Sequence, residues 1–167
     1  MVVIDKKQMP QLSRFVKETD PHRVYTQKLA ELNKQYDITQ RKYLYEKGYK
    51  QLCAEIENEQ DLKRKLEKIT AFLEKNDNVR YNDFARDKIQ ALQKEVGRIK
   101  RNIEFNKYKG DLDAVVKNRP TEDAGDSAFT EFKARVVSLQ EKLCKFKQVQ
   151  HLKRECQGVD QKLQEQL

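Results

Sequence analysis

Apolar residues recur along this chain at alternating spacings of four and three positions. Such spacing places apolar side chains in a narrow seam along one face of a helix, the arrangement by which helices pair in coiled coils. The seam residues are Leu62, Leu66, Ile69 and Leu73; Ala85, Ile89, Leu92, Val96, Ile99 and Ile103; Phe129, Phe132, Val136, Leu139, Leu143 and Phe146; and Leu152, Cys156, Val159, Leu163 and Leu167. The pattern therefore predicts surfaces of contact between helices.

The fold predicted from this pattern is all-α: an elongated coiled coil of two or three long helices, with breaks near residues 76–82 and 118–128. A coiled-coil seam uses about two positions in seven, which is less apolar surface than a compact domain of 167 residues needs. The composition agrees, since 37% of residues are charged, Gly and Pro number only five and three, and the mean hydropathy is −0.99. Disorder is the competing interpretation, but disordered segments do not keep an apolar period through four stretches.

Polar and helix-breaking residues set the boundaries of the predicted helices. Asp20 is placed to cap a helix that begins at Pro21, and Pro120 and Gly125 make the strongest interruption of the chain. The predicted segments are a short N-terminal element at 1–20, a first long, tyrosine-rich helix at 21–75, a polar break at 76–83, a second, basic coiled-coil helix at 84–117, a loop at 118–128 and a third coiled-coil helix at 129–167. Whether the third helix folds back as an antiparallel hairpin or continues outward stays open.

The seam of the first predicted helix changes register once. It follows one register over Tyr25, Leu29, Leu32, Tyr36 and Tyr43 and then slips to another over Tyr45, Tyr49, Leu52 and Ile56. Such a slip locally overwinds or unwinds a supercoil, which disfavours a uniform leucine-zipper-like dimer. The tyrosines suit stacking on single-stranded bases or, as their helical spacing favours, a partner interface in which the ring is buried and the hydroxyl reaches the polar rim.

The seams of the three long stretches are the predicted partner-binding sites. We expect them to pair with another coiled-coil subunit. The predicted partner-binding residues are Leu62, Leu66, Ile69, Leu73, Ile89, Leu92, Val96, Ile99, Ile103, Phe132, Val136, Leu139, Leu143 and Phe146.

A basic run in the second predicted helix is a candidate RNA-binding surface. The chain carries a formal charge of +8, and its basic residues concentrate between positions 94 and 109, where they outnumber Glu95 and Glu104. Such runs neutralise phosphates and give salt-dependent binding to nucleic acid. A solvated helix face, or a dock for an acidic partner helix, is the favoured alternative, because no base-reading motif accompanies the run. The candidate residues are Lys94, Arg98, Lys100, Arg101, Lys107 and Lys109.

The sequence offers little for catalysis or cofactor binding. The three cysteines are an odd number without close pairing, which indicates a reducing compartment, and the two histidines stand alone. Glycine-rich phosphate loops, nucleophile elbows and metal-ligand spacings do not occur. We therefore expect no catalytic residue, no cofactor, no metal and no enzymatic activity. Without a long apolar run or a signal peptide, we also expect a soluble intracellular protein with no membrane contact.

The order of features resembles subunit 7 of the THO complex, a coiled-coil subunit of the nuclear THO/TREX assembly that couples transcription to messenger-RNA packaging and export. The similarity covers most of the chain. Its segments are 11–17 (QLSRFVK), 25–32 (YTQKLAEL), the basic stretch 98–102 (RIKRN), the helix 108–116 and Pro120. The resemblance implies a nuclear scaffold that winds around a subunit 5-like coiled-coil partner, in a larger complex that recruits a DEAD-box RNA helicase.

A second class of function shares these periodicities and interruptions. Cytoskeletal and kinetochore adaptors are also built from interrupted coiled coils. A nucleoplasmic, transcript-associated location favours the first class, and a location on microtubules or centromeres favours the second. Direct RNA binding by the basic run is a third hypothesis, and it predicts a steep loss of affinity with added salt.

Overall fold

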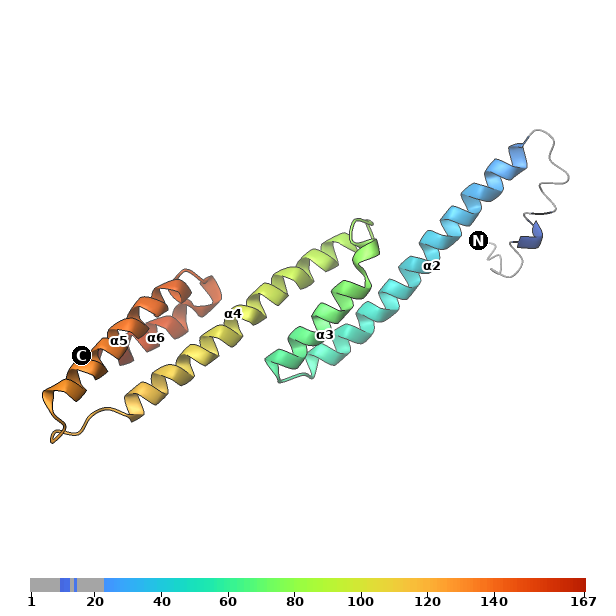
Figure 1. Cartoon of the computed structure of the whole chain (residues 1–167). Helices are drawn as coiled ribbons and strands as arrows, with labels where there is room; N and C mark the ends of the chain where they lie inside the picture. Colours follow the sequence, from blue (N-terminus) through green and yellow to red (C-terminus); the bar gives the residue numbers. More distant parts are fainter. Residues whose placement is uncertain (1–9, 13, 15–22) are drawn as a thin grey trace. The chain divides into compact units, whose positions relative to one another are not determined.

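A computed structural model of the chain describes residues 10–12, 14 and 23–167, and these residues form helices and connecting turns without any strand. This confirms the all-α prediction. The elements are α2 (Val24–Glu57), α3 (Leu62–Lys75), the 3-10 helix η1 (Asp77–Val79), α4 (Arg86–Lys117), α5 (Asp126–Lys147), the 3-10 helix η2 (Gln150–Leu152) and α6 (Lys153–Gln164) (Figure 1). Most of the predicted element at 1–20 lies outside the described residues, as do Asp20 and Pro21, the predicted cap and start of the first long helix.

The prediction of one continuous helix over 21–75 is wrong, because the structure breaks it between Glu57 and Leu62. Two polar side chains explain the break. The Asn58 amide donates to the carbonyl oxygen of Ala54 at 3.1 Å, which satisfies a carbonyl at the end of α2. The Asp61 carboxylate accepts from the backbone N–H of Lys63 at 2.8 Å, which caps the start of α3.

The prediction of one continuous helix over 129–167 is also wrong. The helix α5 ends at Lys147, and Val149 adopts an extended conformation (φ −88°, ψ 111°) before η2 and α6 begin. The helices α5 and α6 run side by side in opposite directions (Figure 1). An ion pair of 2.9 Å between Lys147 Nζ and Asp160 Oδ2 joins them. The chain therefore turns back both after α4 and after α5.

The second predicted helix, 84–117, corresponds to α4, and the two predicted breaks correspond to the turns on either side of it. The described chain falls into two compact units, the first over residues up to 60 and 67–93, the second over 61–66 and 94–167. The helices α3 and α4 each contribute residues to both units. No helix in the described part of the chain is long and apolar enough to cross a membrane.

In the first unit, α3 returns along the C-terminal half of α2 (Figure 1). An ion pair of 3.2 Å joins Lys68 to Glu59 near the turn, and the ring of Phe72 lies 5.6 Å from that of Tyr45 farther along. The ring of Phe84, which precedes α4, lies 5.7 Å from Tyr45. Aromatic rings at these separations are in favourable contact. The buried apolar residues of this unit are Tyr45, Leu52, Ile69, Phe72, Val79, Ala85, Ile89 and Leu92.

In the second unit, the C-terminal part of α4 packs with α5 and α6 around one apolar core. The Tyr108 hydroxyl on α4 donates to the carbonyl oxygen of Leu139 on α5 at 2.9 Å. An ion pair of 2.9 Å between Lys109 and Glu155 joins α4 to α6. The core residues are Phe105, Tyr108, Leu112, Phe132, Val136, Leu139, Leu143, Leu152, Cys156, Val159 and Leu163.

Candidate protein-interaction surface

Most of the residues predicted to bind a partner are covered by the chain itself. Eight are buried: Ile69, Ile89, Leu92, Ile99, Phe132, Val136, Leu139 and Leu143. The other six are partly buried: Leu62, Leu66, Leu73, Val96, Ile103 and Phe146. The described chain therefore leaves few of these positions as an open surface, and their binding to a partner protein stays a prediction. The chain folds back at the two predicted breaks as well as at the two breaks that the sequence pattern did not predict, so these seams pack within the chain.

The N-terminal half of α2 behaves differently. We name the five apolar residues of its first register, Tyr25, Leu29, Leu32, Tyr36 and Tyr43, the α2 stripe. Tyr25, Leu32 and Tyr43 are 65%, 47% and 62% exposed, and the remaining two are partly exposed. No residue between Val24 and Leu44 is buried in the described structure. The α2 stripe is thus an apolar seam that the described part of the chain leaves open.

The register slip explains why the α2 stripe is open. From Tyr43 to Tyr45 the helix turns by about 200°, so the second register lies on the opposite side of α2 from the first. Tyr45 is only 1% exposed, because the second register packs on α3 and on Phe84. In addition, α3 has 14 residues against the 34 of α2, or about 21 Å against about 51 Å, and so it covers only part of that helix.

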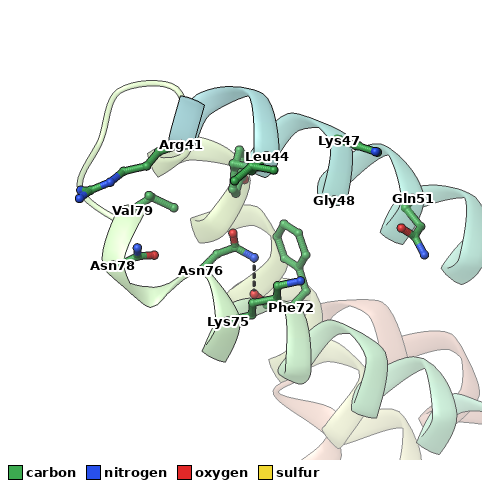
Figure 2. Close-up of a pocket in the computed structure, with 11 residues that line it drawn as sticks. Arg41, Leu44, Lys47, Gly48, Gln51, Phe72, Lys75, Asn76, Asn78 and Val79 are labelled. Atoms are coloured by element: carbon green, nitrogen blue, oxygen red, sulfur yellow. Dashed lines mark hydrogen bonds between the residues drawn. The ribbon is translucent and has the colours of Figure 1, made fainter. Parts of the chain in front are cut away.

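A pocket of about 400 Å³ lies where α2 meets the end of α3. Figure 2 shows Leu44 and Gly48 of α2 on one side and Phe72 and Asn76 on the other, with the Asn76 amide donating to the carbonyl oxygen of Phe72 at 2.8 Å. The lining also includes three cations and no carboxylate among the described residues: Arg41, Lys47 and Lys75. Its chemistry suits an apolar or anionic side chain of another protein.

Tyr45 also lines this pocket, and its hydroxyl is buried without a hydrogen-bond partner among the described residues. Burial raises the pKa of Tyr45 from 10.0 to about 12, with smaller contributions from Tyr49 and Cys53. The phenol therefore stays neutral at physiological pH. A buried hydroxyl without a partner destabilises a fold, so this position is a weak point of the first unit.

The six candidate RNA-binding residues do not form one cationic stripe. At about 100° per residue, Lys94, Arg98, Arg101 and Lys109 fall on one side of α4, and Lys100 and Lys107 fall roughly opposite. Lys109 pairs with Glu155. These positions spread the charge around the helix.

Arg98 is also engaged within the chain. Its guanidinium donates to both carboxylate oxygens of Glu95, at 2.9 and 3.0 Å, and this hydrogen bonding raises the pKa of Arg98. A cation held in such a fork is less available to a phosphate than a free one. This geometry agrees better with a solvated helix face than with a phosphate-binding surface.

The sequence pattern missed three core residues of the second unit. Phe105, Tyr108 and Leu112 are 1%, 4% and 2% exposed, yet they do not continue the seam that ends at Ile103. Their own spacing of three and four is a helical signal. The step from Ile103 to Phe105 is again two residues, so α4 contains the same kind of register slip as α2.

The described residues show no clustered metal ligands. No group of three histidine, cysteine or carboxylate side chains is arranged in this part of the chain to hold a metal ion. Cys53, Cys144 and Cys156 are all free thiols, and burial raises the pKa of Cys156. The α2 stripe with the neighbouring pocket combines exposed apolar residues at helical spacing with a hollow lined by cations.

Comparison of the chain with family models, with curated proteins and with solved structures gives no match.

Proposed function

We propose that this chain is a non-catalytic structural subunit that forms a heteromeric coiled coil with another protein through the α2 stripe. The observation that carries the proposal is the exposure of a helical apolar seam, 47% at Leu32 and more at Tyr25 and Tyr43, whereas the other seam residues of the described chain, apart from the C-terminal Leu167, are buried or partly buried. Contiguous exposed apolar surface is typical of protein-interaction sites. An amphipathic helix with such a seam is a common way to bind a second helix.

We further propose that the complex is a nuclear assembly of the THO/TREX kind, which couples transcription to messenger-RNA packaging and export. The support is the sequence resemblance, above all residues 98–102, 108–116 and Pro120. In this proposal the partner is a subunit 5-like coiled-coil protein within a larger multiprotein complex. RNA is reached through that complex and not by the basic run directly.

A cytoskeletal or kinetochore adaptor is the alternative. It uses the same α2 stripe, so the structure supports the two classes equally. Fluorescence localisation of a tagged chain separates them. Nucleoplasmic signal that depends on transcription supports the THO/TREX proposal, and signal on microtubules or centromeres rejects it.

The interaction itself is tested with a matched pair of aspartate substitutions. Leu32 lies in the α2 stripe and Ile38 lies on a different side of the same half-helix, yet their exposed fractions are almost equal, 47% and 45%. Tagged chains carrying Leu32→Asp or Ile38→Asp are purified, and the co-purifying proteins are identified by mass spectrometry. Leu32→Asp loses the partner, because it places a charge in the helix–helix seam, while Ile38→Asp retains it. Equal recovery with both variants rejects the α2 stripe as the binding surface.

A further inference from the structure

The residues that flank an exposed seam determine which helix can bind to it. In a pair of helices, the positions beside the apolar seam face the corresponding positions of the partner, and their charges select it. On one side of the α2 stripe these positions are Lys28, Gln35 and Lys42. On the other side they are Thr26, Asn33 and Gln40. Each of the six is neutral or basic.

The acidic residues of this half-helix lie elsewhere. Glu31 and Asp37 are the two carboxylates between Val24 and Leu44, and both fall more than about 80° around the helix from the α2 stripe. They stand too far around α2 to face a helix docked on the seam. Between residues 25 and 43 the positions beside the α2 stripe therefore carry only positive charge, and the next carboxylate is Glu46, at the seam position that follows Tyr43.

This charge distribution disfavours a second copy of the chain. In a parallel pair, Lys42 of one copy faces Lys47 of the other. In an antiparallel pair with the stripes aligned end to end, Lys28 faces Lys42. Both arrangements oppose like charges, and the positions that flank residues 25–43 offer no attractive pair.

We propose that the α2 stripe binds a helix of a different protein, and that this helix carries glutamate or aspartate beside its own apolar seam. The inference rests on the proposed function and adds the chemistry of the partner. Carboxylates at these positions pair with Lys28 and Lys42. They also accept hydrogen bonds from the hydroxyls of Tyr25, Tyr36 and Tyr43, which reach the rim when the rings pack in the seam.

Two synthetic helical peptides test the inference on the full chain. Both carry the same leucine and alanine seam over four heptads, and they differ only at the flanking positions, which are all glutamate in one and all lysine in the other. The glutamate peptide binds, and the lysine peptide binds about ten-fold more weakly, since two lysine contacts change from attractive to repulsive. Equal binding of the two peptides, or binding of neither, overturns the inference.

A charge-swap variant provides the matched control. The double substitution Lys28→Glu and Lys42→Glu leaves the seam intact and reverses the preference, so that the lysine peptide binds more tightly than the glutamate peptide. Leu32→Asp reduces binding of both. If the two peptides bind equally and Leu32→Asp removes both, the α2 stripe binds helices without selecting charge. That result overturns the present inference and leaves the proposed function standing.

Two further measurements examine other occupants of the α2 stripe. Sedimentation equilibrium of the full chain gives a monomer, whereas a dimer that dissociates on Leu32→Asp assigns the surface to a second copy. Deleting residues 1–20 leaves binding of the glutamate peptide unchanged. Peptide binding that occurs only after this deletion assigns the surface to the chain's own N-terminal segment. Either of the contrary results overturns the inference.

Discussion

The N-terminal half of α2 and the helix α5 carry the same kind of apolar seam, and the chain uses them in opposite ways. On α5, Val136 and Leu143 are fully buried, whereas on α2 Leu32 is 47% exposed. Both seams contain leucines at helical spacing, so residue type does not separate them. The difference is that α5 packs against both α4 and α6, while α3 reaches only the other half and the other side of α2.

The largest expected effect is on the free energy of unfolding, when a leucine of each seam is replaced by alanine. Leu143→Ala removes a fully buried side chain and lowers the free energy of unfolding by about 2–5 kcal/mol. Leu32→Ala, the same substitution at an exposed seam position, changes it by less than about 0.5 kcal/mol. Urea unfolding of the full-length variants followed by circular dichroism measures both. Similar losses at the two positions would show that the α2 seam is also packed within the chain.

Alkaline pH probes the buried tyrosines of the two units. Burial raises the pKa of Tyr45 and of Tyr108 from 10.0 to about 12. The folded chain then holds these protons after the unfolded chain has lost them, so stability is complete below pH 10 and falls as the pH rises towards 12. The loss is of the order of 1–3 kcal/mol per tyrosine.

Unfolding free energies at pH 8 and pH 11 test this dependence in the parent chain and in Tyr45→Phe and Tyr108→Phe. The phenylalanine variants remove one titrating group each, so each loses less stability at alkaline pH than the parent does. The same loss in both variants as in the parent would contradict the raised pKa values of Tyr45 and Tyr108 in the folded chain.

At neutral pH the same two substitutions change the free energy of unfolding in opposite directions. Tyr108→Phe removes the hydrogen bond to the Leu139 carbonyl and costs about 1 kcal/mol of stability. Tyr45→Phe removes a buried hydroxyl that has no partner among the described residues, and it raises stability by up to about 1 kcal/mol. Thermal unfolding of each variant measures whether its stability is higher or lower than that of the parent chain. A loss of stability with Tyr45→Phe would show that the Tyr45 hydroxyl makes a stabilising hydrogen bond, contrary to this prediction.

The smallest expected effect is the difference in stability between two glycine-to-alanine substitutions, one at an open and one at a packed helical position. A Cβ added at Gly110 on α4 meets no heavy atom within 4 Å, whereas one added at Gly48 on α2 meets the Phe72 ring at 3.4 Å. Gly110→Ala therefore raises stability by about 0.5–1 kcal/mol, through reduced chain entropy on unfolding. Gly48→Ala gives a smaller gain. Equal gains measured by urea unfolding would show that Phe72 does not restrict the packed half of α2.

The sequence predicts the helical fold and the break at 118–128 well, because both depend on local signals. Pro120 keeps the residue before it out of helical geometry and Gly125 is a poor helix former, and the four-and-three spacing is a property of one helix. The breaks at 58–61 and 148–149 were missed because neither contains glycine or proline. They depend on side-chain capping by Asn58 and Asp61 and on the extended conformation of Val149.

The candidate site was harder to predict for a physical reason. A seam shows that a helix buries one face, but it does not show whether the covering helix belongs to the same chain. The register slip at Tyr43 and Tyr45 was visible in the sequence, yet its meaning required the structure, in which only the second register packs on α3. The matching slip between Ile103 and Phe105 was overlooked, and with it the aromatic part of the second core.

Hydrogen–deuterium exchange with mass spectrometry tests the central claim most directly, on the full chain alone and after capture with its partner. Backbone amides of residues 24–44 exchange rapidly in the isolated chain and gain protection in the complex, while those of residues 132–143 are protected in both states. Unchanged exchange at 24–44, or new protection confined to 132–143, would contradict an open interaction seam on α2.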